Sequence, residues 1–282
     1  MRYQQITVAP STKTIGAEIS GVDLSKPLSQ QVFNEIESAL LEYLVIFFRD
    51  QELSPERHIA FAEYFGKLCP PHPILPSLPE NPRISVFEND ADRPAESNVW
   101  HSDVTFQESP AMGSVLYCKH APPTGGDTIW SNMYAAYESI PDSLKRLATS
   151  LMSTHSIETF GSSKIFDSRS TEKMDQVRQE KPPVQHPIVR THPVTGKPCL
   201  FVNRTFTTGI SDLPDEHSAA ILELLYQAVE IPEHQVRMRW QRGTVAVWDN
   251  RCTQHYAVND YYPEYRCMHR LTIEGDAPFY RP

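Results

Sequence analysis

The chain has 282 residues, of which 40% are hydrophobic and 22% charged, so it is long enough to bury a sizeable core. Its formal net charge is −9 with acidic and basic residues interspersed, which excludes the concentrated basic face that nucleic-acid binding requires. Its five cysteines are scattered and form no CxxC pair, which argues against a disulfide framework and a thiolate zinc site.

The ends and the overall pattern of the chain narrow its class further. The N-terminus MRYQQITVAP lacks the basic start and apolar run of a secretory signal, and no stretch is long enough to cross a bilayer. We therefore expect a cytoplasmic protein that has no membrane partner. There is no internal repeat or low-complexity tract, which excludes solenoids and propellers, and we expect a single domain over residues 1–282.

The N-terminal part of the chain predicts two helices and a strand. Ser29 precedes a run whose apolar residues recur at helical spacing, and the β-rich run 44–48 follows it directly. This pattern predicts a helix that leads into a buried strand. Ser54 and Pro55 are typical of an N-cap and a first helical turn, so we expect a second helix that runs to Phe65.

From residue 83 onward the pattern changes to short β-branched or aromatic runs bounded by turn residues. These runs are ISVF, VWHSDVTF, GSVLYC, DTIW, PIVRTHP, CLFVN, QVRMRW, GTVAVW and CMHRLTI. Two helical patterns interrupt them, at 134–151 and 216–229. The order predicts a mainly β protein with flanking helices around a jelly-roll-like core. The polar segment 156–183 shows weak periodicity, and we expect it to be a loop or a lid over the active site.

A candidate metal site begins at His101 and Asp103. They are two apart in the run WHSDVTF, and if that run is a strand, both side chains project from the same face. His255 would complete a set of two histidines and one carboxylate, which suits non-haem iron(II) because it leaves positions open for other ligands. Taken alone, an isolated His-x-Asp is more often a polar pair than a metal site.

Two arginines follow the third candidate ligand. Arg266 and Arg270 are four apart in the strand-like run RCMHRLTI, so both guanidinium groups point to one face while His269 points to the other. A guanidinium binds a carboxylate or a sulfonate through two parallel hydrogen bonds, and its charge survives burial better than that of lysine. The alternative is a pair of solvent-facing arginines on an edge strand.

These residues lie within a series of ordered blocks. The blocks are IGAEISGVDLSKPLS, VIFFRDQ, WHSDVTF, GGDTIW, HPIVRTHPVTGKPCLFVN, FTTGI, VRMRWQRGTVAVWDNRCTQHYAVNDY and MHRLTIEGDAPFYRP. In these blocks and in their order, the chain resembles the taurine dioxygenase (TauD/TfdA) family of Fe(II)- and 2-oxoglutarate-dependent dioxygenases along nearly its whole length. The resemblance implies a double-stranded β-helix core, a jelly roll of the cupin-like kind.

The resemblance also implies roles for single residues. His101, Asp103 and His255 would be the catalytic iron(II) ligands. Arg266 would pair with the distal carboxylate of the cosubstrate 2-oxoglutarate, to which Thr128 would donate its hydroxyl, and O2 would be the second cosubstrate. Two glycines, Gly125 and Gly126, permit the turn before the strand that carries Thr128.

The prime substrate would be a small anion. By the resemblance, Arg270 would hold its anionic head, helped by His72 and by the backbone amide of Val104, and Phe160 and Phe206 would be apolar walls around its carbon atoms. Two positions depart from the taurine-specific members of the family.

These departures are Leu75, where those members have tyrosine, and Ser97, where they have asparagine. Both polar groups are associated with the amine end of taurine, and a leucine cannot replace a phenolic hydroxyl.

The sequence therefore predicts a dioxygenase that hydroxylates a small anionic substrate, with a taurine-like alkyl sulfonate as the first expectation and release of sulfite and an aldehyde. An alkylsulfatase-type dioxygenase, or a biosynthetic hydroxylase or desaturase of an amino-acid-like carboxylate, is the alternative within this class. A cupin-like metal-binding protein without this activity is the alternative outside it. Cytoplasmic enzymes of this size are often homo-oligomers, and we expect one here on that ground alone.

Overall fold

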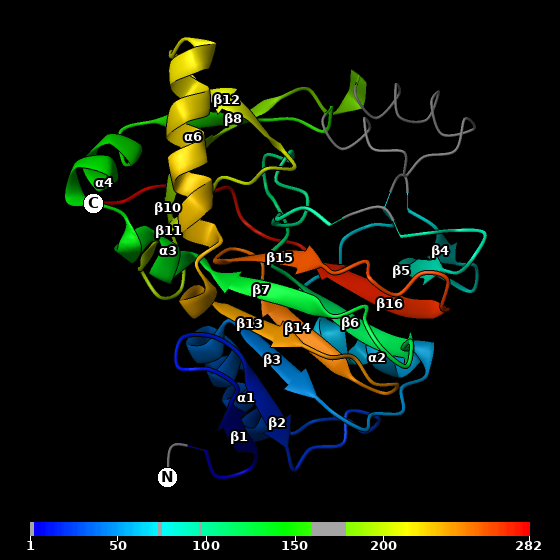
Figure 1. Cartoon of the computed structure of the whole chain (residues 1–282). Helices are drawn as coiled ribbons and strands as arrows, with labels where there is room; N and C mark the ends of the chain where they lie inside the picture. The colour runs from blue at the N-terminus through cyan, green and yellow to red at the C-terminus, as the bar shows by residue number, and fades with distance from the viewer. Residues whose placement is uncertain (1–2, 73–74, 96–97, 159–178) are drawn as a thin grey trace.

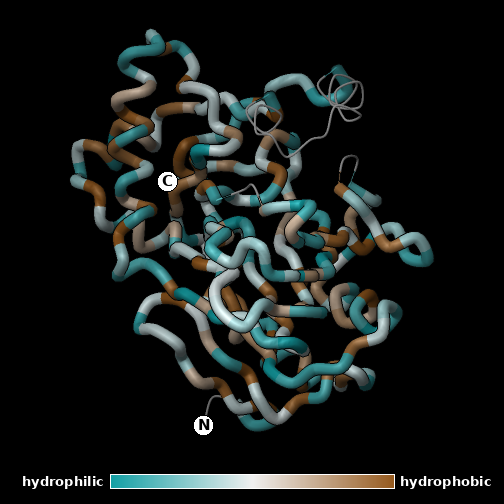
Figure 2. Tube along the Cα trace, turned by 45° about the vertical axis from the view of Figure 1, so that its right-hand side comes forward, coloured by the Kyte–Doolittle hydropathy of each residue, from teal (hydrophilic) through white to brown (hydrophobic). Residues whose placement is uncertain are grey.

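The structure is a computed structural model of the whole chain, and it describes residues 3–72, 75–95, 98–158 and 179–282 (Figure 1). Strands make up its centre, and helices lie on the outside. Hydrophobic and hydrophilic residues alternate along the coloured part of the chain (Figure 2). The expectation of a mainly β protein with flanking helices is confirmed. No helix in the described part of the chain is long and apolar enough to cross a membrane.

The largest sheet has eight strands that come from both ends of the chain. In spatial order they are β1 (Thr7–Pro10), β2 (Ala17–Ser20), β3 (Val45–Phe48), β14 (Val245–Asp249), β6 (Gly113–His120), β16 (Arg266–Ile273), β5 (Asn81–Asn89) and β4 (Ser77–Leu78). All neighbouring strands are antiparallel except β2 and β3. The sheet thus brings β16 beside β6, far from it in sequence.

Three smaller sheets complete the β structure. One has the order β13 (Gln235–Met238), β7 (Thr128–Asn132) and β15 (Thr253–Ala257); another has the order β12 (Thr207–Ile210), β8 (Met152–His155) and β9 (Val184–Pro187). The third is the hairpin of β10 (Val189–Thr191) and β11 (Pro198–Leu200). The runs predicted as strands lie in these elements, apart from VWHSDVTF.

Two hydrophobic cores lie on opposite faces of the large sheet. On β3, Val45 and Phe47 belong to the core shared with Trp130 of the smaller sheet, whereas Ile46 and Phe48 belong to the core that the first two helices cover. Side chains alternate between the faces of a strand, so a strand buried on both sides is apolar throughout. The first core includes side chains between the large sheet and β13-β7-β15, and the cavity described below opens beside them.

The first two helices form where the sequence predicts them. Helix α1 spans Gln30–Tyr43, and the side chain of its N-cap Ser29 accepts a hydrogen bond from the Val32 amide. Helix α2 spans Pro55–Glu63, and its N-cap Ser54 accepts from the Arg57 amide. Such caps satisfy amide groups that have no partner within the helix. Figure 1 shows α1 beside β2 and β3.

The expected helix at 134–151 is in fact two helices. Helix α3 (Met133–Ser139) and helix α4 (Asp142–Ala148) are separated by Ile140 and Pro141, which have extended backbone conformations. The prediction of one helix was wrong because proline has no amide hydrogen and its ring clashes with the preceding turn.

The expected helix at 216–229 is confirmed as α6 (Asp215–Val229), and a 3-10 turn, η3 (Pro232–His234), follows it. The expected loop or lid at 156–183 falls mainly on residues 159–178, which lie outside the described residues.

Candidate active site

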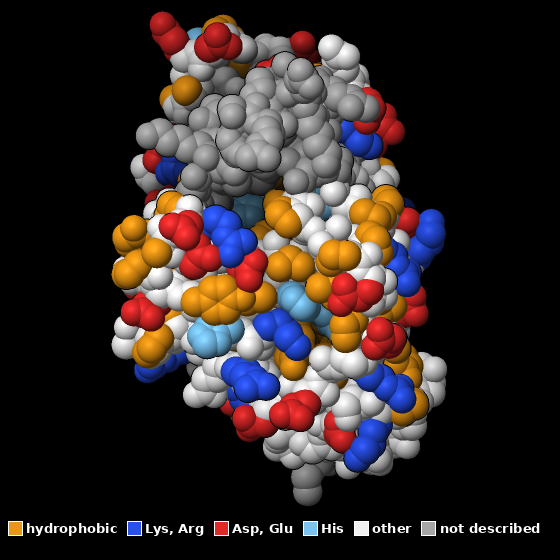
Figure 3. Space-filling view, turned by 90° about the vertical axis from the view of Figure 1, so that its right-hand side faces the viewer, with side chains coloured by type: hydrophobic (Ala, Val, Ile, Leu, Met, Phe, Trp, Pro, Cys, Tyr) orange, Lys and Arg blue, Asp and Glu red, His pale blue; other side chains and the backbone are white. Residues whose placement is uncertain are grey.

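A cavity of about 580 Å³ opens between the large sheet and β13-β7-β15. Its volume lies in the range of roughly 300–1,000 Å³ that is typical of small-molecule sites. Most of its walls are apolar, and its polar lining includes these predicted site residues: His72, His101, Asp103, Thr128, His255, Arg266 and Arg270. In Figure 3, histidine side chains lie among hydrophobic and basic ones on the face of the molecule shown there.

The three candidate metal ligands converge in this cavity. The Nε2 atoms of His101 and His255 lie 3.8 and 4.0 Å from Oδ1 of Asp103, and the two imidazole ring centroids are 4.1 Å apart. One ligand atom from each of the three residues lies within 4.8 Å of the others. Two imidazoles and one carboxylate on one side of a cavity form a facial set that leaves room for further ligands.

The strand-like interpretation of WHSDVTF was wrong. Residues 103–106 form a turn and 107–109 are bends, and in this run only His101 makes a β-bridge, with His255 of β15. His101 donates its amide to the His255 carbonyl at 3.1 Å, and His255 donates to the His101 carbonyl at 2.8 Å. The backbone turn, with Val104 at a φ of 51°, brings Asp103 back toward both histidines. The residues therefore converge as predicted, but through a turn and not through a shared strand face.

The protonation state of the imidazoles suits a metal. Nδ1 of His101 lies 2.8 Å from the Val99 carbonyl and donates to it, which leaves the lone pair of Nε2 facing Asp103. Burial lowers the pKa of His101, and burial with the neighbouring His101 ring lowers the pKa of His255 to about 3. Both rings are therefore neutral near pH 7, as metal ligands must be.

Asp103, which lies beside the two imidazoles, is ionised. Burial alone would raise its pKa, but the Arg270 guanidinium and the two imidazoles outweigh burial and hold the pKa well below its usual range. Arg270 donates to Oδ1 of Asp103 at 2.9 Å, and the Ser114 hydroxyl donates to Oδ2 at 3.2 Å. Hydrogen bonds of this kind orient a carboxylate that ligates a metal.

Arg266 is a buried cation in the same cavity. Its side chain is 7% exposed, burial lowers its pKa, and Nε has no hydrogen-bond partner. In the part of the chain that the structure describes, no carboxylate lies within ion-pair distance of it, and its guanidinium lies 5.7 Å from the ring centroid of Tyr261. A buried guanidinium is costly without an anion, which makes Arg266 suited to bind the carboxylate of a small molecule.

Thr128 begins β7 and lines the same cavity. Its hydroxyl oxygen accepts a hydrogen bond of 2.9 Å from Nε1 of Trp240, so its own proton can be donated to another group. The turn before it is as predicted, because Gly125 and Gly126 have φ values of 76° and 69°. Gly126 does more than permit the turn, since a Cβ atom there would lie 3.2 Å from Cδ of Arg266.

The end of the cavity assigned to the substrate anion has Arg270 and His72. Arg270 extends from β16 on the same face as Arg266, as the strand period predicts, and its guanidinium lies 4.7 Å from the Phe87 ring centroid. Nδ1 of His72 accepts the Leu75 amide at 3.1 Å, so in the neutral ring the proton is on Nε2. Leu75 itself lines the cavity. Ser97 lies outside the described residues.

The apolar walls come from a small separate cluster. Val104, Phe106, Ala111, Ile157 and Phe206 pack together, and the Phe106 and Phe206 ring centroids are 5.2 Å apart. Val104 and Phe206 line the cavity, as expected. Phe160, the other expected wall residue, lies outside the described residues.

Three residues that the sequence did not predict contact the predicted site residues or line the cavity with them. These residues are Ser114, Phe106 and Trp240. Phe106 and Trp240 lie inside the blocks WHSDVTF and VRMRWQRGTVAVWDNRCTQHYAVNDY, which was the available signal. The pairing of Trp240 with Thr128 spans 112 positions, and no local pattern reveals it.

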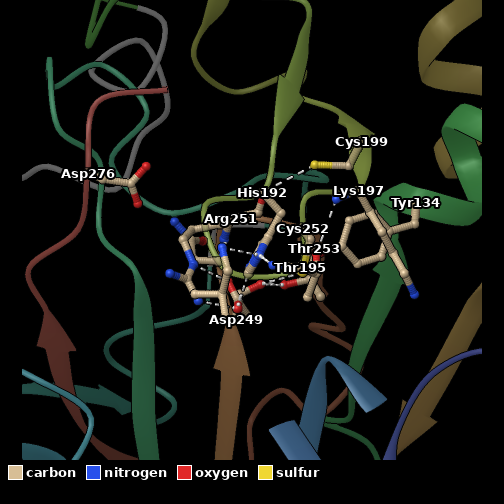
Figure 4. A network of polar contacts seen from close by, with 12 residues as sticks. Tyr134, His192, Thr195, Lys197, Cys199, Asp249, Arg251, Cys252, Thr253 and Asp276 are labelled. Atoms are coloured by element: carbon tan, nitrogen blue, oxygen red, sulfur yellow. Dashed lines mark hydrogen bonds and ion pairs between the residues drawn. The ribbon is translucent and has the colours of Figure 1, made fainter. Parts of the chain in front are cut away.

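A second group with metal-binding side chains has a structural explanation. His192, Asp249 and Cys252 lie close together, but Nε2 of His192 donates to Asp249 at 3.0 Å and its Nδ1 accepts from backbone amides (Figure 4). Arg251 also binds both carboxylate oxygens of Asp249. Since protein groups occupy the histidine and the carboxylate, we assign this cluster to the stability of the corner between β14 and β15.

Comparisons with known proteins identify relatives of the whole chain. The sequence profile described as Taurine catabolism dioxygenase TauD, TfdA family matches residues 7–272. An alkylsulfatase from Acinetobacter baylyi is 38% identical over 97% of this chain and 86% of its own length. An alpha-ketoglutarate-dependent sulfate ester dioxygenase from Pseudomonas putida is 36% identical over 97% of this chain and 91% of its own length.

Solved structures resemble the chain over the same extent. The crystal structure of a taurine dioxygenase from Burkholderia xenovorans superimposes with a TM-score of 0.84 at 33% identity, covering 98% of this chain and 91% of the other. A similarity of this extent confirms the jelly-roll core that the sequence predicted.

Proposed function

The chain belongs to the taurine catabolism dioxygenase TauD, TfdA family, and from this premise we propose that it is a 2-oxoglutarate-dependent dioxygenase that oxidises alkyl sulfate esters. The observation that carries the proposal is the convergence of three features in one cavity: a His-Asp-His set, a buried arginine with no carboxylate partner among the described residues, and a second arginine beside apolar walls. We further propose that residues 1–282 form one dioxygenase domain.

His101, Asp103 and His255 would hold iron(II). Neutral imidazoles and an ionised carboxylate are the donor set that such an ion requires, and the three groups have this state near pH 7. When bound, the metal supplies the activation of O2 that oxidises a substrate C–H bond. Ser114 and Arg270 hold the carboxylate in place for this ion.

Arg266 and Thr128 would bind the distal carboxylate of 2-oxoglutarate. The guanidinium contributes charge and a planar pair of donors, while the Thr128 hydroxyl, with Trp240 at its oxygen, contributes a third. Burial strengthens these contacts because the dielectric constant around them is low. Oxidation of the substrate is balanced by conversion of 2-oxoglutarate and O2 to succinate and carbon dioxide, which the family assignment implies.

Arg270, His72 and the Val104 amide would bind the anionic head of the substrate. The apolar cluster with Phe106 and Phe206 would surround its carbon chain, and the side chain of Leu75, which lines the cavity, offers no hydrogen-bond partner to an ammonium group. An alkyl sulfate has these properties, namely an anion at one end and an apolar tail without an amine. Relatives named for alkyl sulfate and sulfate ester chemistry support this choice.

The position of the oxidised carbon determines the products. When a hydroxyl group is inserted at the carbon that bears the sulfate oxygen, that carbon carries two oxygen substituents. The hydroxyl proton then leaves, the C–O bond to sulfate breaks, and an aldehyde and inorganic sulfate are released. The protein would contribute placement, because the contacts to the anion would hold that carbon beside the proposed metal ligands.

A direct test is aerobic turnover of hexyl sulfate with iron(II) and 2-oxoglutarate, with succinate, sulfate and hexanal measured together. We expect equal amounts of the three products, and no sulfate after His101→Ala. A hydroxylated product that retains every atom would instead indicate a biosynthetic hydroxylase. Bound metal with no succinate would contradict the dioxygenase and favour a cupin-like metal-binding protein.

Alkyl sulfonates, including taurine-like ones, are the second candidate substrates. A sulfonate presents the same three oxygen atoms to Arg270, and one relative at 33% identity is named a sulfonate dioxygenase, from Schizosaccharomyces pombe. Sulfite release from hexanesulfonate at a higher kcat/KM than sulfate release from hexyl sulfate would make this candidate the preferred one.

A further inference from the structure

Asn250 is a buried amide whose side chain binds the backbone of a proposed metal ligand. It follows the last residue of β14 and is 1% exposed. Its Oδ1 accepts the amide of Asp103 at 2.7 Å, and its Nδ2 donates to the Asp103 carbonyl at 3.0 Å and to the Ala111 carbonyl at 3.1 Å. One side chain thus satisfies both backbone polar groups of Asp103.

Asn250 is one of three connections between the same two segments. The backbone of His101 pairs with that of His255, and the hydroxyl of Ser102 donates to the Thr253 carbonyl at 2.7 Å. The His-x-Asp turn is therefore bound, residue by residue, to the corner that also carries the third proposed ligand. Only the Asn250 contacts reach the residue with the carboxylate.

The turn needs such support because its backbone is strained. Val104 has a φ of 51°, which a β-branched residue rarely adopts. A conformation of this kind persists only where surrounding contacts hold it, and it is often found at functional sites. The Asn250 contacts lie on the residue immediately before Val104.

The same contacts orient the Val104 amide. The Asp103 carbonyl and the Val104 N–H belong to one planar trans peptide unit, so they point in opposite directions. Since Nδ2 of Asn250 binds that carbonyl, the Val104 N–H is directed away from Asn250. Val104 lines the cavity, where this amide is a proposed donor to the substrate anion.

We propose that Asn250 is a positioning residue that fixes the Asp103–Val104 peptide, and through it both the metal carboxylate and an anion-binding amide. The proposal rests on the proposed metal site. Asn250 itself touches neither the metal nor the substrate, so its effect must be detected on metal affinity and on the backbone of the turn.

The test uses Mn(II) as a redox-inert probe on the full chain. Asn250→Ala removes all three side-chain hydrogen bonds, whereas Asn250→Asp keeps the acceptor for the Asp103 amide and loses the donor to the carbonyls of Asp103 and Ala111. We expect each variant to bind Mn(II) at least about tenfold more weakly than the unmodified protein, as is typical when a group that orients a ligand is lost. The added negative charge of the aspartate would by itself favour cation binding. Weaker Mn(II) binding in that variant would therefore be due to the loss of the Nδ2 donor and its two hydrogen bonds.

Asn132→Asp is the matched control. Asn132 is also buried, and its side chain also accepts backbone amides and donates to a carbonyl, that of Thr14. We expect this variant to bind Mn(II) within twofold of the unmodified protein. In metal-free protein, peptides covering 101–106 should exchange amide hydrogens faster in both Asn250 variants and not in Asn132→Asp.

The outcomes separate this inference from the proposed function. Folded Asn250 variants that bind Mn(II) as tightly as the unmodified protein, with unchanged exchange at 101–106, would overturn the positioning role and leave the metal site intact. An unmodified protein that binds no Mn(II) or iron(II) would overturn the proposed metal site, and this inference with it. If Asn250→Ala does not fold, Asn250→Asp, which is close to the same size, gives the result alone.

Discussion

Gly126 places the turn before β7 against the side chain that we assign to 2-oxoglutarate. An alanine there would have to adopt a φ of 69°, and its Cβ would lie 3.1 Å from Cγ of Pro122 and 3.2 Å from both Cδ of Arg266 and Cδ1 of Tyr261. We expect Gly126→Ala to displace the guanidinium and raise the dissociation constant of 2-oxoglutarate by roughly tenfold, equivalent to about 1.4 kcal/mol. Anaerobic titration of the iron(II)-loaded protein with 2-oxoglutarate measures this.

Gly196→Ala is the matched control for that prediction. Gly196 has a φ of 70°, and a Cβ there would meet nothing within 4 Å. The backbone cost of about 1 kcal/mol should therefore appear in both variants, as a lower free energy of unfolding. Weaker binding of 2-oxoglutarate in Gly196→Ala as well would show that general destabilisation, and not contact with Arg266, is responsible.

Trp240 acts on the cosubstrate through Thr128. Its Nε1 donates to the Thr128 hydroxyl, and the loss of one such hydrogen bond costs about 1 kcal/mol. We expect Trp240→Phe to weaken 2-oxoglutarate binding roughly fivefold without changing metal affinity. If Trp240 acts through Thr128, the double variant with Thr128→Val binds no more weakly than Thr128→Val alone. Additive losses would contradict the coupling.

For single residues, the sequence predicts where a side chain lies when its position follows from the regular repeat of one strand or helix. Arg266 and Arg270 share a face because they are four apart on one strand, and His269 is less buried, on the other side. Asn250 and Trp240 could not be found in this way. Each acts on a residue more than 100 positions away, and such a contact depends on the assembled sheets.

The corner between β14 and β15 carries both Asn250 and His255, and a buried charged network holds it (Figure 4). Asp249 is fully buried and accepts hydrogen bonds from both Arg251 and His192. We expect Asp249→Asn to lower the free energy of unfolding by roughly 3 kcal/mol, because it leaves a mostly buried guanidinium without its counter-charge. Denaturant unfolding measures this. Glu63→Gln, which breaks an exposed pair with Arg83, should cost less than about 1 kcal/mol.

The same carboxylate predicts a pH dependence. Burial would raise the pKa of Asp249, but Arg251 and His192 outweigh it and hold the pKa below its ordinary value of 3.8. The contribution of Asp249 to stability is therefore fully present above about pH 4. It is lost as the pH falls further, because the carboxylate takes up a proton in the unfolded chain before it does so in the folded protein. The difference in stability between the unmodified protein and Asp249→Asn should shrink below pH 4. A difference that grows there would contradict this account.

Helices that begin with a capping residue and strands with β-branched or aromatic runs were predictable from the sequence. The points where such an element is interrupted were harder to predict. The run 99–106 has the composition of a strand, but the bridge to His255 involves His101 alone and the chain then turns. The apolar residues of that turn pack in the small cluster with Phe206, which is a tertiary contact and gives no local signal.

In the molecule as a whole, the two faces of the large sheet carry different cores. The core beneath α1 and α2 is apolar, whereas the opposite core surrounds a cavity lined by two arginines and three candidate metal ligands. The ordered blocks predicted this architecture because they extend along the whole chain. The expected homo-oligomer stays a prediction, because composition and fold do not determine which surface of a chain is covered.

The most direct measurement of the central claim is an anaerobic visible spectrum of the protein with iron(II) and 2-oxoglutarate, titrated with hexyl sulfate. If the metal, the cosubstrate and the substrate anion share one cavity, a weak charge-transfer band appears with 2-oxoglutarate and shifts as hexyl sulfate binds, while taurine at the same concentration leaves it unchanged. A band that neither hexyl sulfate nor hexanesulfonate perturbs would contradict the substrate assignment. The absence of any band while iron is bound would contradict the dioxygenase itself.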